Sequence, residues 1–230
     1  MNENVDTSSL KRTLASSTYE ELRKEIIAGK LPSKAKLNIR QLASRFQVGL
    51  APIREALSRL STEGLVSQSD HRGFAVVSTT VEELWDLHGA RVRLNELALR
   101  ESIEFGDAAW EEQLVVAGHR LLRIKRPKDD VFGADADEWS RQHKAFHHAL
   151  LAACQSKRIL QFCDQLFDEL ERYRHVGRHV PQTRPDVADE HRAIMQAALD
   201  RNADQATSLL KEHYLRTVKR VEIGLTRTSE

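Results

Sequence analysis

Cysteine, proline and long apolar runs are all scarce in this chain, which has two cysteines and five prolines among 230 residues. Cys154 and Cys163 form no C-x-x-C pair and lie in a helical pattern, so we expect reduced thiols in a core. No apolar run approaches the roughly 18 residues that span a bilayer, and the N-terminus lacks the apolar region of a signal peptide. These absences favour a cytoplasmic protein over a secreted or membrane-inserted one.

Charge of neither sign dominates, because the formal net charge is +1 at pH 7. The charges are nevertheless unevenly distributed: residues 1–78 contain 12 Lys/Arg against 8 Asp/Glu, and the remainder contains 23 against 26. A basic segment in a nearly neutral chain indicates where a polyanion such as nucleic acid would bind. The length predicts one to two domains, each with enough interior for a hydrophobic core.

The basic segment shows three helical patterns followed by an extended one. Thr18 begins a capping-box spacing, which predicts a first helix over residues 18–28. Asn38 predicts the cap of a second helix, because its side-chain oxygen accepts a hydrogen bond from an otherwise unpaired amide. Pro52 suits the first turn of a third helix, which ends at Gly64.

Two short extended runs follow that third helix, at residues 65–68 and 74–77, with a polar turn between them. Helix, tight turn, basic helix and basic hairpin are together the layout of a winged helix-turn-helix. The full series is typical of a DNA-binding module rather than an inert three-helix domain. One such module makes few base contacts, so we expect a homodimer that binds palindromic double-stranded DNA.

Beyond residue 78 the pattern is helical, without a further strand, and predicts an antiparallel bundle. The expected helices are 81–105, 107–124, 136–154, 156–176, 186–199 and 203–225. The chain is thus predicted to be mostly α, with an N-terminal winged helix-turn-helix domain and a C-terminal all-α bundle. The expected limits are a flexible tail at 1–17, the DNA-binding domain at 18–78, and an effector-binding and dimerisation domain at 79–230.

Four histidines of the expected bundle have a spacing that suits one metal ion. His143 and His147 are four residues apart, so their side chains leave one face of a helix about one turn apart. His191 and His213 each lie eleven residues from Asn202, which is in the turn between two expected helices. In an antiparallel hairpin, equal distances from the turn place both imidazoles at the same level along the helix axes. The pattern predicts one transition metal ion per chain, and imidazole ligands favour zinc or nickel.

Several roles are compatible with these histidines. Four neutral imidazoles cancel none of the charge of a divalent cation, so an ion with open positions would bind a small carboxylate effector. Four ligands in a closed tetrahedral set would make the metal structural. A hydrolase would need a general base, but Glu190 and Glu212 point about 100° away from the ligands beside them in the sequence. With ten histidines in the chain, a polar pocket of coincidental spacing is the remaining alternative.

Residues 51–66, Ala-Pro-Ile-Arg-Glu-Ala-Leu-Ser-Arg-Leu-Ser-Thr-Glu-Gly-Leu-Val, resemble the signature of the GntR-type bacterial transcription regulators. The helical remainder resembles the FadR-like branch of that family, which carries an FCD effector domain. The two resemblances cover about residues 18–225. They imply a homodimeric, metabolite-responsive transcription regulator, with repression as the expected mode, and no enzymatic activity.

The resemblance also implies which residues contact DNA. Two arginines match family positions that contact the operator, and the wing tip would enter the minor groove. Before the third helix, Gly49-Leu50-Ala51 replaces the Ser/Thr-Arg-Thr tract of the family, so we expect an unusual operator and apolar contact with a thymine methyl group. The expected DNA-binding residues are Arg40, Leu50, Ala51, Pro52, Arg54, His71, Arg72 and Gly73.

For the bundle, the resemblance implies a metal site and an effector site. The metal pattern of FCD domains is matched at His147, His191 and His213, whereas His143 stands where Asp or Asn is usual. Arg91 begins a stretch similar to the family's Arg-x-x-Leu-Glu, and its guanidinium offers a bidentate fork for a carboxylate. The expected effector-binding residues are Arg91, Asn95 (in place of the family's Glu) and Arg172, and the expected effector is a small organic acid.

Overall fold

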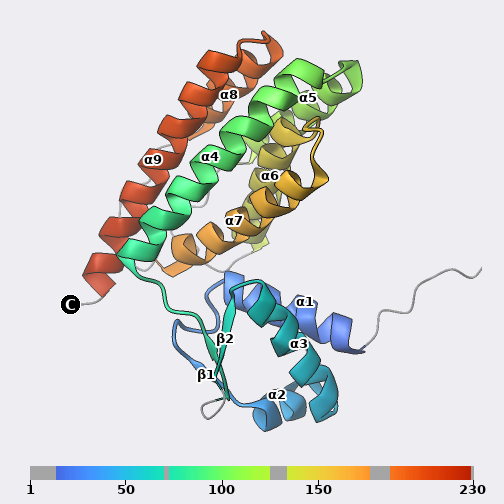
Figure 1. Cartoon of the computed structure of the whole chain (residues 1–230), viewed down its shortest axis with the longest axis vertical. Helices are drawn as coiled ribbons and strands as arrows, with labels where there is room; N and C mark the ends of the chain where they lie inside the picture. Colours follow the sequence, from blue (N-terminus) through green and yellow to red (C-terminus); the bar gives the residue numbers. More distant parts are fainter. Residues whose placement is uncertain (1–13, 70–72, 125–133, 177–186, 229–230) are drawn as a thin grey trace, which may run out of the picture. The chain divides into compact units, whose positions relative to one another are not determined.

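The computed structural model describes residues 14–69, 73–124, 134–176 and 187–228. The chain divides into two compact units, Met1–Ser78 and Thr79–Glu230 (Figure 1). Each unit has a hydrophobic core of its own. The described residues are mostly helical, which confirms the predicted fold class. No helix within these ranges is long and apolar enough to cross a lipid bilayer.

The first unit combines three helices with a small antiparallel sheet. Its elements are α1 (Leu14–Ile27), β1 (Lys36–Leu37), α2 (Ile39–Phe46), α3 (Leu50–Thr62), β2 (Val66–Ser69) and β3 (Gly73–Val76). The strand order is β1-β3-β2, so β3 pairs with both other strands. Fully buried side chains of α1 and α3 supply much of the core: Leu22, Ile26, Ile53, Leu57 and Leu60. This packing fixes α3 against α1 and leaves its opposite face in solvent.

The first helix starts earlier than the sequence analysis predicts. α1 begins at Leu14 rather than Thr18, so residues 14–17 are helical and do not belong to a tail. Thr18 does not cap the helix, because its hydroxyl donates to the carbonyl of Leu14 at 2.7 Å. Ala15 and Tyr19 extend the buried face of the helix, which explains the earlier start. Residues 1–13, the rest of the expected tail, lie outside the described residues.

The helix-turn-helix follows the predicted plan with one shift. Asn38 caps α2 as predicted, since its Oδ1 accepts from the backbone amides of Arg40 and Gln41 at 3.0 and 3.2 Å. α3 starts at Leu50, two residues before Pro52, and its N-cap Gly49 makes no side-chain hydrogen bond. Of the three residues that replace the family's Ser/Thr-Arg-Thr tract, Gly49 is therefore the N-cap of α3, and Leu50 and Ala51 belong to its first turn.

The wing has a third strand that the sequence analysis did not predict. β1 is only two residues long, too short to show an alternating pattern, and it pairs Leu37 with Phe74 of β3. The neighbouring amide of Val76 donates to the carbonyl of Ala35 at 2.9 Å. The predicted hairpin strands are present, so the two-stranded wing is in fact a three-stranded sheet.

The second unit consists of helices in its described part. They are α4 (Val81–Phe105), α5 (Ala108–Arg123), α6 (Ala134–Leu151), α7 (Lys157–Val176), α8 (Ala188–Leu199) and α9 (Ala203–Thr228). Figure 1 shows α8 and α9 as a hairpin, with α9 running beside α4. The two cysteines are free and buried, as predicted, and burial raises the pKa of Cys163 to about 11.

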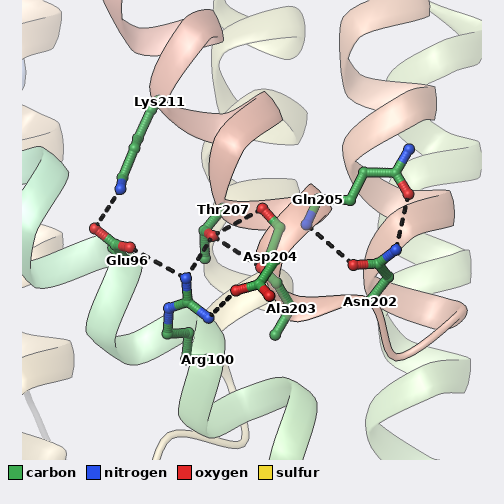
Figure 2. Close-up of polar contacts among 8 residues, drawn as sticks. All are labelled: Glu96, Arg100, Asn202, Ala203, Asp204, Gln205, Thr207 and Lys211. Atoms are coloured by element: carbon green, nitrogen blue, oxygen red, sulfur yellow. Dashed lines mark hydrogen bonds and ion pairs between the residues drawn. The ribbon is translucent and has the colours of Figure 1, made fainter.

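Side-chain contacts show that α4 and α9 run antiparallel. Trp85 near the start of α4 donates from Nε1 to Glu222 near the end of α9 at 3.0 Å. At the opposite end, Arg100 contacts Asp204 at 2.7 Å and Thr207 at 3.3 Å (Figure 2). Glu96 then accepts from Lys211 at 2.7 Å, one turn further along both helices (Figure 2). These contacts fix the register of the two longest helices.

Capping residues account for where the helices of the second unit begin. Thr80 accepts from the amide of Glu83 at 3.2 Å, and the predicted helix 81–105 is confirmed. Asp107 caps α5 by accepting from the amide of Trp110 at 2.9 Å. α6 ends at Leu151, three residues earlier than predicted, because the amide of Cys154 turns back to the Leu151 carbonyl at 3.0 Å.

Gly106 at the end of α4 provides a test of this packing. A Cβ there would lie 2.5 Å from the Ser102 carbonyl oxygen and would overlap the Trp110 ring, which is buried. We expect Gly106→Ala to lower the free energy of unfolding by about 1–3 kcal/mol, the usual cost of overpacking. Gly89→Ala is the control, since a Cβ in this helix interior meets only the mobile end of Arg93 at 3.2 Å. Urea denaturation in which Gly106→Ala matches Gly89→Ala would contradict the expectation.

Candidate functional site

Four imidazoles meet in the interior of the second unit. His143 and His147 come from α6, His191 from α8 and His213 from α9, and all are at most 4% exposed. One ring nitrogen of each lies within 4.8 Å of the corresponding nitrogen of the others. Nitrogens about 2.0–2.1 Å from one tetrahedral ion are roughly 3.4 Å apart, so the more distant of the four nitrogens would move closer to share one ion. The α8–α9 hairpin brings the rings of His191 and His213 to 4.7 Å between centroids, as their equal distance from Asn202 suggests.

A carboxylate orients one of these imidazoles. Glu190 of α8 accepts from Nδ1 of His213 at 2.7 Å and pairs with Arg216 at 3.1 Å. The hydrogen bond places the ring proton on Nδ1 and leaves the lone pair of Nε2 for the cluster. Burial alone would raise the pKa of Glu190, but His213 and Arg216 hold it below its ordinary value. The Glu190 carboxylate is thus paired with His213 and Arg216, and it is not placed as a general base.

His143 has a different set of neighbours. Its ring stacks on Trp139 with centroids 4.5 Å apart, and its Nε2 lies 3.1 Å from Nε2 of His147. Nδ1 of His143 lies 3.3 Å from an Nη atom of Arg174, which also pairs with Glu171. Arg174 is 8% exposed, so a cation lies inside the unit next to the histidines.

The sequence analysis missed Arg174 and selected Arg172 instead. The two residues are separated on α7 by about 200° of rotation, so they lie on opposite sides of the helix. Arg172 is buried with its guanidinium carbon 5.4 Å from the Tyr173 ring centroid, whereas Arg174 contacts His143. The signal available in the sequence was the Glu171-to-Arg174 spacing, which favours an ion pair one turn apart.

Three of the four imidazoles, those of His143, His147 and His213, favour their neutral form. Burial lowers the pKa of His143 and His147 well below the ordinary value, and the positive neighbours lower it further. Burial also lowers the pKa of His213, although Glu190 opposes the shift. Neutral imidazole is the form that binds metal, and Nδ1 of His147 has no hydrogen-bond partner among the described residues. The residues therefore fit a late transition metal ion.

The predicted effector residues Arg91 and Asn95 lie one turn apart on α4 and are both buried. The guanidinium carbon of Arg91 lies 3.9 Å from the ring centroid of Tyr214 and 5.1 Å from that of Phe167. Asn95 accepts from the Tyr214 hydroxyl at 3.0 Å. Within the described residues, Nε of Arg91 and Nδ2 of Asn95 are buried without a hydrogen-bond partner. These two donors are free to meet an acceptor.

A cavity of about 390 Å³ adjoins the histidine cluster. Its apolar lining includes Leu151, Leu160 and Phe167, and its polar lining residues are Asn95, His147, His148, Gln161 and Asp164. Small-molecule sites combine such apolar walls with a few converging polar groups. The cavity has room for a small organic molecule with an apolar part.

In the first unit, the predicted DNA-binding residues of the two helices lie on its surface. Arg40 lies in the first turn of α2, Arg54 lies on α3, and both are exposed. Leu50 and Ala51 are exposed in the first turn of α3, and Pro52 is half-buried. Gly73 is exposed at the start of β3 with φ of 75°, which favours glycine, and the expected His71 and Arg72 lie outside the described residues.

Arg59 has a structural position, although its sequence pattern places it on the outer face of α3 with Arg54. Its guanidinium carbon lies 3.9 Å from the ring centroid of Tyr19 on α1, and it contacts Ser16 at 3.5 Å. Tyr19 in turn donates to Glu63, which also pairs with Arg23. These contacts tie α3 to α1, whereas Arg54 is exposed and makes no ion pair within the described part of the chain.

A winged helix-turn-helix unit joined to a helical unit with a buried histidine cluster is an architecture of bacterial transcription regulators. Residues 14–76 match the model of the gntR family of bacterial regulatory proteins, and residues 86–216 match that of the FCD domain. The chain therefore belongs to the GntR family and carries an FCD domain, as the sequence resemblance predicts. The matched families and relatives are transcription regulators, not enzymes.

Two curated relatives extend over nearly the whole chain. The uncharacterized HTH-type transcriptional regulator BphR of Paraburkholderia xenovorans is 34% identical and aligned over 94% of this chain and 89% of its own. The HTH-type transcriptional repressor GlaR of Escherichia coli is 33% identical over 86% and 90%. The solved structure of E. coli McbR/YncC has the same fold, with a TM-score of 0.75, 17% identity and coverage of 91% and 97%.

The lowered pKa values predict how stability depends on pH. The unfolded histidines titrate near pH 6.5, whereas His143 and His147 resist protonation in the folded state. Below about pH 6.5 the unfolded state takes up more protons, so we expect metal-free protein to lose up to about 1.4 kcal/mol per pH unit for each such histidine. Urea denaturation with a chelator, between about pH 7.5 and 5.5, measures this slope.

The control separates these histidines from other titrating groups. His147→Gln should make the pH slope shallower, because it removes one buried imidazole. His119→Gln should leave the slope close to that of the wild type, since it replaces an exposed side chain on α5. Equal slopes for all three proteins would contradict the assignment of the effect to the buried cluster.

Proposed function

We propose that the protein is a repressor whose operator binding responds to a small carboxylate held beside a transition metal ion in the second unit. The observation that carries the proposal is the group of four buried imidazoles, next to two buried donors and a cavity. The name of the relative GlaR, a transcriptional repressor, supports the mode of regulation. The first unit, from the start of α1 to residue 78, would bind DNA, and residues 79–230 would bind the effector and a second chain.

For DNA binding, we place α3 in the major groove. Arg54 projects from the exposed face of α3 and has the fork that reads guanine, and Arg40 at the start of α2 suits a phosphate. Leu50 and Ala51 offer apolar surface to a thymine methyl group, with Pro52 beside them. Gly73, together with His71 and Arg72 of the wing tip, would approach the minor groove. A homodimer on a palindrome would present two such surfaces one helical turn apart.

For effector binding, we assign the ion to the histidine cluster. Zinc or nickel suits imidazole ligands, and when bound it would supply positive charge and an open position for an anion. Arg91 has an unpaired buried Nε and could hold the same carboxylate, while Asn95 donates from Nδ2. The apolar wall of the cavity would receive the rest of the acid. Arg172 is the remaining residue predicted to contact the effector. Arg174 lies closer to the histidine cluster, because it contacts His143.

The DNA-binding part is tested with Arg54→Ala. Selection from a random duplex library gives a bound sequence, and fluorescence anisotropy then measures affinity. Loss of one guanine-reading arginine should weaken binding by roughly 10- to 100-fold, which corresponds to about 1–3 kcal/mol. Lys157→Ala, an exposed cation at the start of α7, should bind like the wild type. Wild-type affinity in Arg54→Ala would refute the placement of α3.

The effector-binding part is tested with His147→Ala. Elemental analysis of gently purified wild type should find about one zinc or nickel ion per chain, and His147→Ala should lose it. A panel of small carboxylates should then release the selected duplex from metal-loaded wild type but not from His147→Ala. His119→Ala is the control, because His119 is exposed on α5 and does not line the cavity. Absence of metal after reconstitution would reduce the cluster to a polar pocket.

A further inference from the structure

The hydrogen bond from Arg174 determines which nitrogen of His143 carries the ring proton. A guanidinium has N–H donors and no acceptor, so Nδ1 of His143 must accept at the 3.3 Å contact. A neutral imidazole has one N–H and one lone pair. The proton of His143 is therefore on Nε2, the atom that lies among the other imidazoles.

The contacts of His147 agree with this assignment. Nε2 of His147 lies 3.1 Å from Nε2 of His143, a distance that suits a hydrogen bond between a donor and an acceptor. His143 donates there, so His147 accepts and carries its own proton on Nδ1. The lone pair of His147 Nε2 consequently faces the cluster, in the form that a metal ion binds.

Metal binding needs a lone pair, and His143 has none to offer at Nε2. Ligation would require its proton to move to Nδ1, where it would oppose an N–H of Arg174 in a buried position. Arg174 is not easily displaced, because it pairs with Glu171 and its guanidinium carbon lies 5.2 Å from the Trp139 ring centroid. His213 is in the opposite situation, since Glu190 accepts from its Nδ1 and leaves Nε2 available.

We propose that Arg174 keeps His143 out of the coordination sphere, so that His147, His191 and His213 are the protein ligands and His143 donates from Nε2 to the anionic effector. The proposal rests on the proposed metal site and assigns its fourth histidine a different role. Arg174 is then a positioning residue that sets the tautomer of His143. Arg174 and His143 are 8% and 3% exposed, so bulk solvent has little access to their contact.

The first test is zinc affinity, measured by competition with a chromophoric chelator on the full-length chain. His147→Ala should weaken zinc binding by roughly 100-fold, because it removes a ligand, whereas His143→Ala should stay within about threefold of the wild type. Equal losses in the two variants would overturn the proposal and leave the metal site standing. Failure of the wild type to bind zinc would overturn both.

The second test releases His143. Glu171→Gln/Arg174→Gln removes both members of the buried ion pair, so that neither is left without the other, and the buried Arg91 also loses the attraction of Glu171. The glutamine at 174 can accept from Nδ1, which frees Nε2 of His143, and zinc should bind roughly tenfold more tightly. Adding His143→Ala to this background should abolish the gain. A double variant that folds and binds zinc no better than the wild type would contradict the tautomer argument.

The third test uses acetate as the anionic probe on cobalt-loaded protein, followed by visible absorption. A hydrogen bond to a charged group contributes about 1.5–3 kcal/mol, so His143→Ala should bind acetate roughly tenfold or more weakly than the wild type. Equal affinities would show that His143 does not donate to the bound anion. Because this comparison uses two folded, metal-loaded proteins, it decides the question even where the double variant does not fold.

Discussion

The antiparallel packing of α4 against α9 is the constraint on which the second unit depends. Contacts at Trp85, Glu96 and Arg100 fix the register along the whole length of α4. That register places Tyr214 of α9 opposite Asn95 and Arg91. His213 of the cluster directly precedes Tyr214 in α9. With α8 folded back on α9, imidazoles from three helices then reach one level. The site is thus a product of helix register more than of any loop.

Burial gives this site its chemical character. Imidazoles, guanidiniums and carboxylates are costly to remove from water, and here each is retained next to a specific neighbour. Glu190 accepts from His213, and Glu171 pairs with Arg174. A unit selected only for stability would replace such groups with apolar side chains. Their retention in the interior is consistent with a binding function.

Much of this arrangement could be predicted from the sequence. The caps at Asn38 and Thr80 mark helix starts, and the spacing of the histidines around Asn202 indicates their convergence. The two-residue strand β1 was missed because it has no periodicity. Arg172 was preferred over Arg174 because the rotation of α7 about its axis depends on tertiary packing. The tautomer of His143 depends on a partner 31 residues away, which spacing alone does not identify.

The apolar first turn of α3 has a consequence for the ionic-strength dependence of DNA binding. Leu50 is 45% exposed where the family pattern has a cation, so each bound chain would neutralise one phosphate fewer. Each phosphate contact releases condensed counterions and steepens the decline of affinity with salt by about 0.9 in a double-logarithmic plot. A dimer would lack two such contacts. The dimer would therefore keep its discrimination between operators at higher salt concentrations. Its affinity for unrelated DNA, which depends on phosphate contacts, would be lower.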